Sequence, residues 1–204
     1  DETIYYLGQG YVFFEKNSES DYLFNGNNVS NNTEFDNYLK RLGYKFKFEN
    51  HEFGDYIILK NKKICLIMDS GSTPNFKYTK DYQSGALSFE IFSNGKKLVS
   101  NCGYYKKNNS QLNKLSKSSA TQNTLTIDDN SSCKFNKIKN LWLVKEGLKI
   151  IDKNSVCEKN YWKINASHDG YLKKYYTTHE REIEFYPEQF KFIGTDKILN
   201  KILN

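Results

Sequence analysis

The chain has 204 residues and a formal net charge of +6, from 30 basic and 24 acidic side chains. This length fits one β domain or two small ones. Lysines alternate with acids along most segments, which is typical of a solvated surface and differs from the long basic tracts that bind nucleic acid. No stretch approaches the ~18 consecutive apolar residues of a membrane span. We therefore expect no membrane span and no nucleic-acid partner, although the positive balance would suit an anionic polymer.

The composition favours strands over helices. Aromatic residues make up 16% of the chain, with 16 Tyr and 14 Phe, and such side chains suit half-buried pleated surfaces. The four cysteines are widely spaced without a CxxC pair, so we interpret them as small buried hydrophobic residues, with a disulfide still open. The histidines, His51, His168 and His179, share no metal-binding spacing. We expect neither a metal site nor a cofactor.

The N-terminal part is mixed in character. Asp1 is neither an initiator nor the start of a signal sequence, so we interpret it as the product of processing or trimming. Residues 1–22 contain two short apolar bursts and are interpreted as an edge segment or the tail of an upstream region. Residues 34–42 predict a short helix, because their apolar side chains share one helical face after the N-cap residue Thr33.

Two strands are predicted at residues 56–59 and 64–68, joined by a polar turn. Both are continuously apolar, which indicates burial on both faces of a sheet. Residues 87–92 alternate between apolar and polar side chains, meet Asn94-Gly95 and resume as a further strand. Asn-Gly supplies the positive φ angles of a tight turn, so this segment predicts a hairpin.

The second half of the chain begins with a polar, lysine-rich segment, residues 106–119, that predicts a long surface loop. Further short strands are predicted at residues 124–127, 141–144, 149–151, 161–166 and 182–186. Pro187 begins a turn into a last strand at residues 190–193. Evenly spaced short strands with turns between them predict a mainly β fold, an antiparallel β-sandwich with one short helical segment near the N-terminus.

Two histidines lie at predicted strand ends. His168 precedes the turn residues Asp169 and Gly170, where it would either donate to a sugar or carboxylate or simply bond the turn backbone. His179 begins another strand, and a solvated or paired role is the plain alternative to a functional one. The residues alone leave both questions open.

Tyrosines alternate with lysines in residues 171–176. This pattern suits stacking on sugar rings while the lysines meet acidic groups. It suits equally an exposed edge strand protected by lysines. Composition does not separate the two interpretations.

A series of short motifs resembles the C-terminal domain of the heparinase II/III-like polysaccharide lyases. The motifs are LFNG (23–26), LIMDSG (66–71), QSGALSFE (83–90), NCG (101–103), SSATQNTL (118–125) and ASHDGY through HER (166–181). Their order is a stronger signal than any single motif. The resemblance assigns residues 23–204 to that domain and implies a supersandwich-like arrangement of its sheets.

The resemblance implies a bacterial protein whose whole form joins an upstream α/α toroid to this β domain and acts on acidic polysaccharide. Such lyases abstract the proton α to a uronate carboxylate and eliminate the 4-linked sugar, with a base and an acid placed across the cleft. Much of that machinery resides in the toroid. We therefore interpret the chain as the C-terminal wall of the cleft, inactive without its toroid, with a periplasmic or a cytoplasmic location left open.

Three residues depart from the family's motifs. Gln83 and Gln122 stand where members commonly carry histidine, and Asn101 stands near the aspartate of members that hold a metal. Neutral amides do not act as bases and bind zinc poorly, so a zinc site is not expected here. Two interpretations of these amides stay open. They form a hydrogen-bonding patch for sugar hydroxyls, or they replace lost functional groups without harm.

Four residues, His168, Tyr171, His179 and Arg181, match the family's motifs unchanged. The predicted substrate-binding set joins them to the three amides: Gln83, Asn101, Gln122, His168, Tyr171, His179 and Arg181. No catalytic residue is assigned. The alternative from a different class is a non-catalytic carbohydrate-binding or scaffolding β domain, which the amide substitutions favour.

Overall fold

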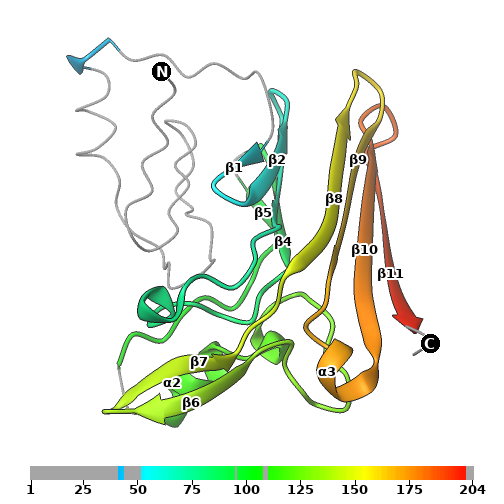
Figure 1. Cartoon of the computed structure of the whole chain (residues 1–204). Helices are drawn as coiled ribbons and strands as arrows, with labels where there is room; N and C mark the ends of the chain where they lie inside the picture. The colour runs from blue at the N-terminus through cyan, green and yellow to red at the C-terminus, as the bar shows by residue number, and fades with distance from the viewer. Residues whose placement is uncertain (1–40, 44–51, 95, 108–109, 201–204) are drawn as a thin grey trace.

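The computed structural model describes residues 41–43, 52–94, 96–107 and 110–200. Over these residues the fold is mainly β, with two large antiparallel sheets and one separate hairpin (Figure 1). The predicted mainly β class is confirmed. No helix in this part of the chain is long and apolar enough to cross a membrane. The segment 1–22, and nearly all of the helix predicted at residues 34–42, lie outside the described residues.

The first sheet has the strand order β1-β2-β3-β4-β5. Its strands are β1 (Glu52–Phe53), β2 (Tyr56–Lys60), β3 (Ile64–Asp69), β4 (Phe89–Ser93) and β5 (Lys96–Val99). The second sheet has the order β11-β10-β9-β8. Its strands are β8 (Ile150–Cys157), β9 (Trp162–His168), β10 (Thr177–Tyr186) and β11 (Lys191–Asn200). The hairpin consists of β6 (Lys134–Ile138) and β7 (Leu141–Glu146). The helices are η1 (Phe76–Tyr78), α2 (Gln111–Ser116), η2 (Ser119–Thr121) and α3 (Leu172–Tyr175).

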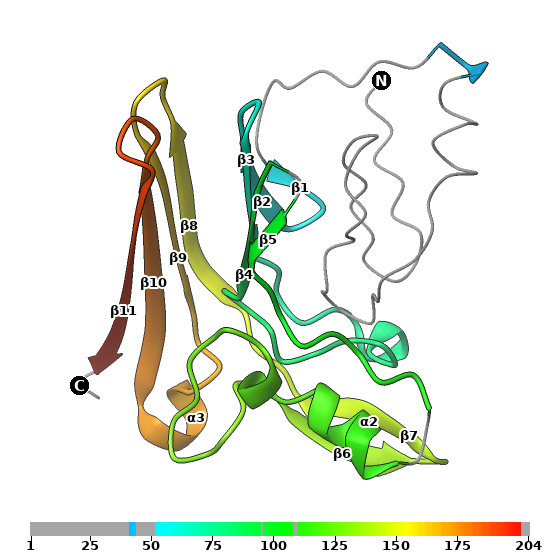
Figure 2. The ribbon, with the colours of Figure 1, turned by 180° about the vertical axis from the view of Figure 1, so that it is seen from behind.

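The two large sheets stand as two facing layers (Figures 1 and 2). Their facing side chains form one buried cluster. It comprises Ile57, Leu59, Ile64, Leu66, Met68, Leu87, Ile91, Trp162, Ile164, Ala166, Ile183 and Phe185. Each large apolar side chain buried in this way contributes about 1.5–3 kcal/mol, so this cluster is the main force that holds the layers together. The antiparallel sandwich is the arrangement that the strand pattern predicted.

The continuous apolarity of β2 and β3 has its predicted cause, because both faces of these strands are buried. One face belongs to the cluster between the sheets. The other face forms a second cluster of Tyr56, Ile58, Cys65, Ile67 and Phe92. Strand β10 differs, since its residues alternate between buried and half-buried from His179 onward. Its outward side chains include Glu182, which lies 2.7 Å from the Lys163 ammonium on the next strand.

Several predicted elements need correction. Residues 106–119 are not a plain loop, because Ser110 accepts a hydrogen bond from Asn113 N and so caps α2 within them. Residues 124–127 form no strand but end in an isolated bridge between Ile127 and Asn130. The strand predicted from residue 87 begins at Phe89, since Leu87 has a left-handed backbone with φ of 61°.

Two further corrections concern the second half of the chain. Residues 171–176 are not an edge strand, because a helical turn, α3, occupies Leu172–Tyr175 and ends at Tyr176 in a left-handed conformation. Strand β6 lay in a segment for which no strand was predicted. The four cysteines, all within the described residues, form no disulfide, and Cys102 is exposed instead of buried.

Candidate functional site

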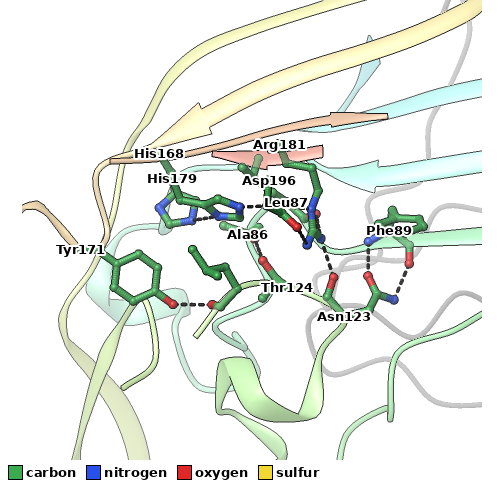
Figure 3. A network of polar contacts seen from close by, with 11 residues as sticks. Ala86, Leu87, Phe89, Asn123, Thr124, His168, Tyr171, His179, Arg181 and Asp196 are labelled. Atoms are coloured by element: carbon green, nitrogen blue, oxygen red, sulfur yellow. Dashed lines mark hydrogen bonds and ion pairs between the residues drawn. The ribbon is translucent and has the colours of Figure 1, made fainter. Parts of the chain in front are cut away.

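Two histidine side chains meet at one end of the second sheet. His168 ends β9 and His179 lies near the start of β10, and the antiparallel register makes them direct cross-strand neighbours. Nε2 of His168 lies 3.2 Å from Nδ1 of His179 (Figure 3). The two residues are 1% and 0% exposed, so they form a polar pair inside the sandwich.

The turn after β9 fixes the protonation pattern of this pair. Gly170 N–H donates to Nδ1 of His168 over 3.0 Å, so that nitrogen carries no proton. The His168 proton is therefore on Nε2 and is donated to His179 Nδ1, which leaves the His179 proton on Nε2. Burial, together with repulsion from His179 and Arg181, lowers the pKa of His168 to about 3, in agreement with a neutral ring.

Asp196 accepts the hydrogen bond from the second histidine of the pair. Nε2 of His179 lies 2.6 Å from Asp196 Oδ1. Arg181 is the cross-strand neighbour of Asp196, and its Nε and Nη2 donate to the two carboxylate oxygens over 2.8 and 2.9 Å. Partial burial raises the pKa of Asp196, but the bonds from His179 and Arg181 outweigh it and hold the pKa well below its ordinary value.

Arg181 also ties the second sheet to the first. Its Nη1 donates to the carbonyl oxygen of Leu87 over 2.9 Å and to that of Asn123. Asn123 in turn exchanges two hydrogen bonds with the backbone of Phe89, the first residue of β4. Since the guanidinium lies 5.5 Å from the centre of the Phe89 ring, the arginine is held by a carboxylate, two carbonyls and an aromatic face.

Of the three amides, Asn101 joins this network, and Gln83 and Gln122 form a cluster of their own. Asn101 Oδ1 accepts from Asn123 N over 3.0 Å, and this bond links Asn101 to the arginine. Gln83 and Gln122 meet at one carbonyl, because the Nε2 groups of both donate to Ser116 O, over 2.5 and 3.3 Å. Gln83 Nε2 also donates to Gly103 O over 3.0 Å. These side chains fasten the loops that precede and follow α2.

Tyr171 fastens a further loop beside the histidines. Its hydroxyl donates to the carbonyl oxygen of Leu125 and lies 3.4 Å from that of Asn130. Burial is the main cause that raises the pKa of Tyr171 to about 12. The phenol therefore stays protonated and serves as a donor to the backbone.

The structure divides the predicted set into two groups and buries all of it. Contacts link His168, His179, Arg181, Tyr171 and Asn101, whereas Gln83 and Gln122 meet each other at Ser116 O. Their exposed fractions run from 0% for His179 to 7% for Gln122 and Arg181. In this arrangement they contact protein atoms, and direct contact with a substrate stays a prediction. For His168 the turn-backbone interpretation is confirmed, and His179 has the paired role. No group of three His, Cys, Asp or Glu side chains in the described residues is arranged to hold a metal ion.

Two members of the network were not predicted, Asp196 and Asn123. Asn123 lies within a motif that was recognised, directly after Gln122. Asp196 lies beyond the last predicted strand residue, on a strand that runs on to Asn200. In the structure Tyr186 pairs with Lys191, which places Asp196 opposite Arg181. The predicted start of the last strand at residue 190 would have placed residue 195 there, so the predicted register missed Asp196.

Comparisons with known proteins agree with this architecture. The sequence model of the family described as Heparinase II/III-like, C-terminal, matches residues 47–202. A solved structure described as heparinase III has a TM-score of 0.65 at 16% identity, over 91% of this chain and 31% of that chain. A heparan sulfate lyase HepC mutant from Pedobacter heparinus has a TM-score of 0.63 at 13% identity, over 89% of this chain and 30% of that chain.

A third structure, of the heparinase III-BT4657 gene product, has a TM-score of 0.64 at 15% identity, over 87% of this chain and 29% of that chain. At these identities the likeness shows the fold alone. The chain spans about a third of the length of these proteins. No curated protein sequence matches the chain.

Proposed function

The chain belongs to the heparinase II/III-like family, whose C-terminal domain it matches, and on that premise we propose that it is the C-terminal β domain of a polysaccharide lyase. The observation that carries this proposal is the continuous hydrogen-bond network from His168 through His179 and Asp196 to Arg181, with the Tyr171 ring against His168. Its histidines and its arginine belong to the two motifs, SHDGY and HER, that match the family unchanged, and Asp196 of β11 joins them. Every ring nitrogen of the two histidines has a hydrogen-bond partner, as expected of an intact domain.

The proposed role of the domain is to form one wall of a cleft for acidic polysaccharide. The relatives named heparinase III and heparan sulfate lyase are about three times as long as this chain, which supports a cleft completed by other parts of the protein. We assign the chemistry to an upstream α/α toroid. There a base takes the proton α to the uronate carboxylate, a double bond forms, and the C–O bond to the 4-linked sugar breaks as an acid protonates the leaving oxygen.

Within this wall, the buried residues act by position. Arg181 connects β10 to the carbonyls of Leu87 and Asn123, and Gln83 and Gln122 hold the chain around Ser116. Held loops present a fixed surface to a sugar chain, which lowers the entropy lost on binding. Direct contact of the seven predicted residues with sugar would need these loops to open, and it remains the more demanding version of the proposal.

A non-catalytic carbohydrate-binding or scaffolding domain is the second candidate. The observation that favours it is the amide cluster, because the side-chain amides of Gln83 and Gln122 donate hydrogen bonds to main-chain carbonyls. Neutral amides in these positions supply neither a base nor an acid. This candidate requires binding of polysaccharide without cleavage.

Incubation of the full-length protein with a panel of uronate polymers, heparan sulfate first, separates the two candidates. The lyase proposal predicts a rise in ultraviolet absorbance from unsaturated products and no such rise with a neutral glucan. The variant Lys159→Gln, at an exposed turn far along β9 from His168, is the matched control and should cleave as the unaltered protein does. Binding of the polymers without any unsaturated product would establish the scaffold instead.

A further inference from the structure

A cavity of about 230 Å³ lies beside the SHDGY loop, between α3 and the β6-β7 hairpin. These elements lie at the same end of the molecule in Figure 1. Three lysines, Lys134, Lys173 and Lys174, line the cavity together with two carboxylates, Glu146 and Asp169. The difference of three positive and two negative groups leaves the cavity one unit positive.

One carboxylate serves two of the lysines. Glu146 accepts from Lys134 over 3.1 Å through Oε2 and lies 3.2 Å from Lys173 through Oε1. Each of its oxygens therefore faces one ammonium, and its single negative charge offsets only one of the two positive charges. The Lys173 side chain is 78% exposed, so its remaining protons are directed to solvent.

The third lysine is held by neutral groups. Lys174 Nζ donates to the amide oxygen of Asn130 over 2.9 Å and lies 5.0 Å from the centre of the Tyr175 ring. Asn130 also donates to the Tyr175 hydroxyl over 2.8 Å, which fixes the amide that orients the lysine. The ammonium is thus positioned at the cavity without a counter-charge from these partners.

The part of the cavity lining around Gly170 is tightly packed. Gly170 lies so close to Ser132 that an added Cβ would be 2.7 Å from the Ser132 carbonyl oxygen. The Gly170 N–H is held by His168, and the Tyr171 hydroxyl is held by Leu125. The buried network therefore sets the shape of this cavity, and a ligand would meet walls that are already in place.

We propose that this cavity is a subsite that binds one singly charged acidic group of a polysaccharide, a uronate carboxylate or a sulfate ester. The positive surplus, the oriented Lys174 and the half-buried Tyr175 ring suit one acidic sugar unit. The cavity volume lies below the ~300–1,000 Å³ of pockets that enclose a whole drug-sized ligand. The cavity therefore suits a single sugar unit of a longer polysaccharide. The inference rests on the proposed function, because it names where the domain meets its polymer.

The test measures binding of four probes to the full-length protein by calorimetry: a sulfated heparin tetrasaccharide, an unsulfated hyaluronan tetrasaccharide, neutral cellotetraose and single-stranded DNA. At least one of the two acidic tetrasaccharides should bind, and cellotetraose should not. Lys174→Gln and Lys173→Gln should each weaken the acidic probes about five- to tenfold, with unchanged melting temperature. Lys159→Gln removes the same charge elsewhere and should leave binding unchanged.

The two acidic probes show whether carboxylate alone suffices or sulfate is needed, and either result supports the subsite. Equal binding of cellotetraose, tighter binding of DNA than of either acidic probe, or unaltered binding by both variants would overturn it. Unaltered binding with polymer still cleaved refutes the subsite alone. Binding that the variants weaken, without cleavage of any uronate polymer, refutes the lyase proposal and leaves the subsite standing.

Discussion

Nε2 of His168 and Nδ1 of His179 lie 3.2 Å apart across β9 and β10, and a single proton occupies the space between them. A second proton on His168 would have to displace the Gly170 N–H from Nδ1. The folded protein therefore excludes the charged form of His168, and this exclusion makes the stability of the domain depend on pH.

The folded pKa of His168, about 3, lies below its ordinary 6.5, so between these values the unfolded chain binds a proton that the folded chain does not. The contribution to stability is complete above pH 6.5 and is lost as the pH falls toward 3. At pH 5 the loss is roughly 2 kcal/mol. Urea unfolding at several pH values should show it, and His168→Asn, which keeps an acceptor for Gly170, should flatten the curve between pH 6.5 and 5. An equally steep curve in the variant would contradict the assignment.

Asp196→Asn should lower the free energy of unfolding by about 2 kcal/mol at pH 7, because it leaves the Arg181 guanidinium without its carboxylate. This figure is below that for a fully buried pair, since the Asp196 side chain is 40% exposed. Glu180→Gln removes an exposed pair with Lys197 on the same two strands and should leave the urea midpoint almost unchanged. Equal effects of the two substitutions would show that the network contributes no more to the free energy of unfolding than an exposed ion pair.

Gly170→Ala should destabilise the domain by about 1–3 kcal/mol, because the new Cβ would meet Ser132 O at 2.7 Å and Ser132 Cβ at 2.9 Å. Gly194→Ala is the matched control, since a Cβ there meets nothing within 4 Å. Thermal melting of the two variants measures the difference. A stable Gly170→Ala protein would mean that the SHDGY loop has room to move.

Gln83→Glu should destabilise the protein by about 3 kcal/mol at neutral pH, because a buried carboxylate would replace the amide that donates to Ser116 O and Gly103 O. Gln189→Glu makes the same change at an exposed turn and should be nearly neutral. Denaturant midpoints at pH 7 test the pair. If the two variants were equally stable, the hydrogen bonds of the Gln83 side chain would not stabilise the fold as its contacts indicate.

The sheets were predictable from local patterns, because burial on two faces makes β2 and β3 continuously apolar and burial on one face makes β10 alternate. The segment 106–119 was misassigned because its helix is short and polar. Its α2 buries only Asn113 and Ser116, so it has no apolar stripe to detect. Likewise β6 is largely exposed and leaves little periodic signal.

The members of the site were predicted mostly from family motifs, whereas their contacts came only with the register. His168 and His179 have no helical spacing, and nothing in their neighbours shows that one sits across from the other. Their partnership requires β9 and β10 to pair through the turn that contains α3. The burial of the site was also not foreseen, because polar side chains in motifs were taken as surface groups. Hydrogen bonds to one another and to the main chain offset the cost of burying these polar side chains.

The imidazole chain also gives the domain a spectroscopic identity. Each ring proton is held between a nitrogen and an acceptor, and both rings are shielded from water. In proton magnetic resonance the two ring N–H protons should exchange slowly with the solvent and give separate low-field signals. An intact sandwich can thereby be recognised in a tube that contains no sugar at all.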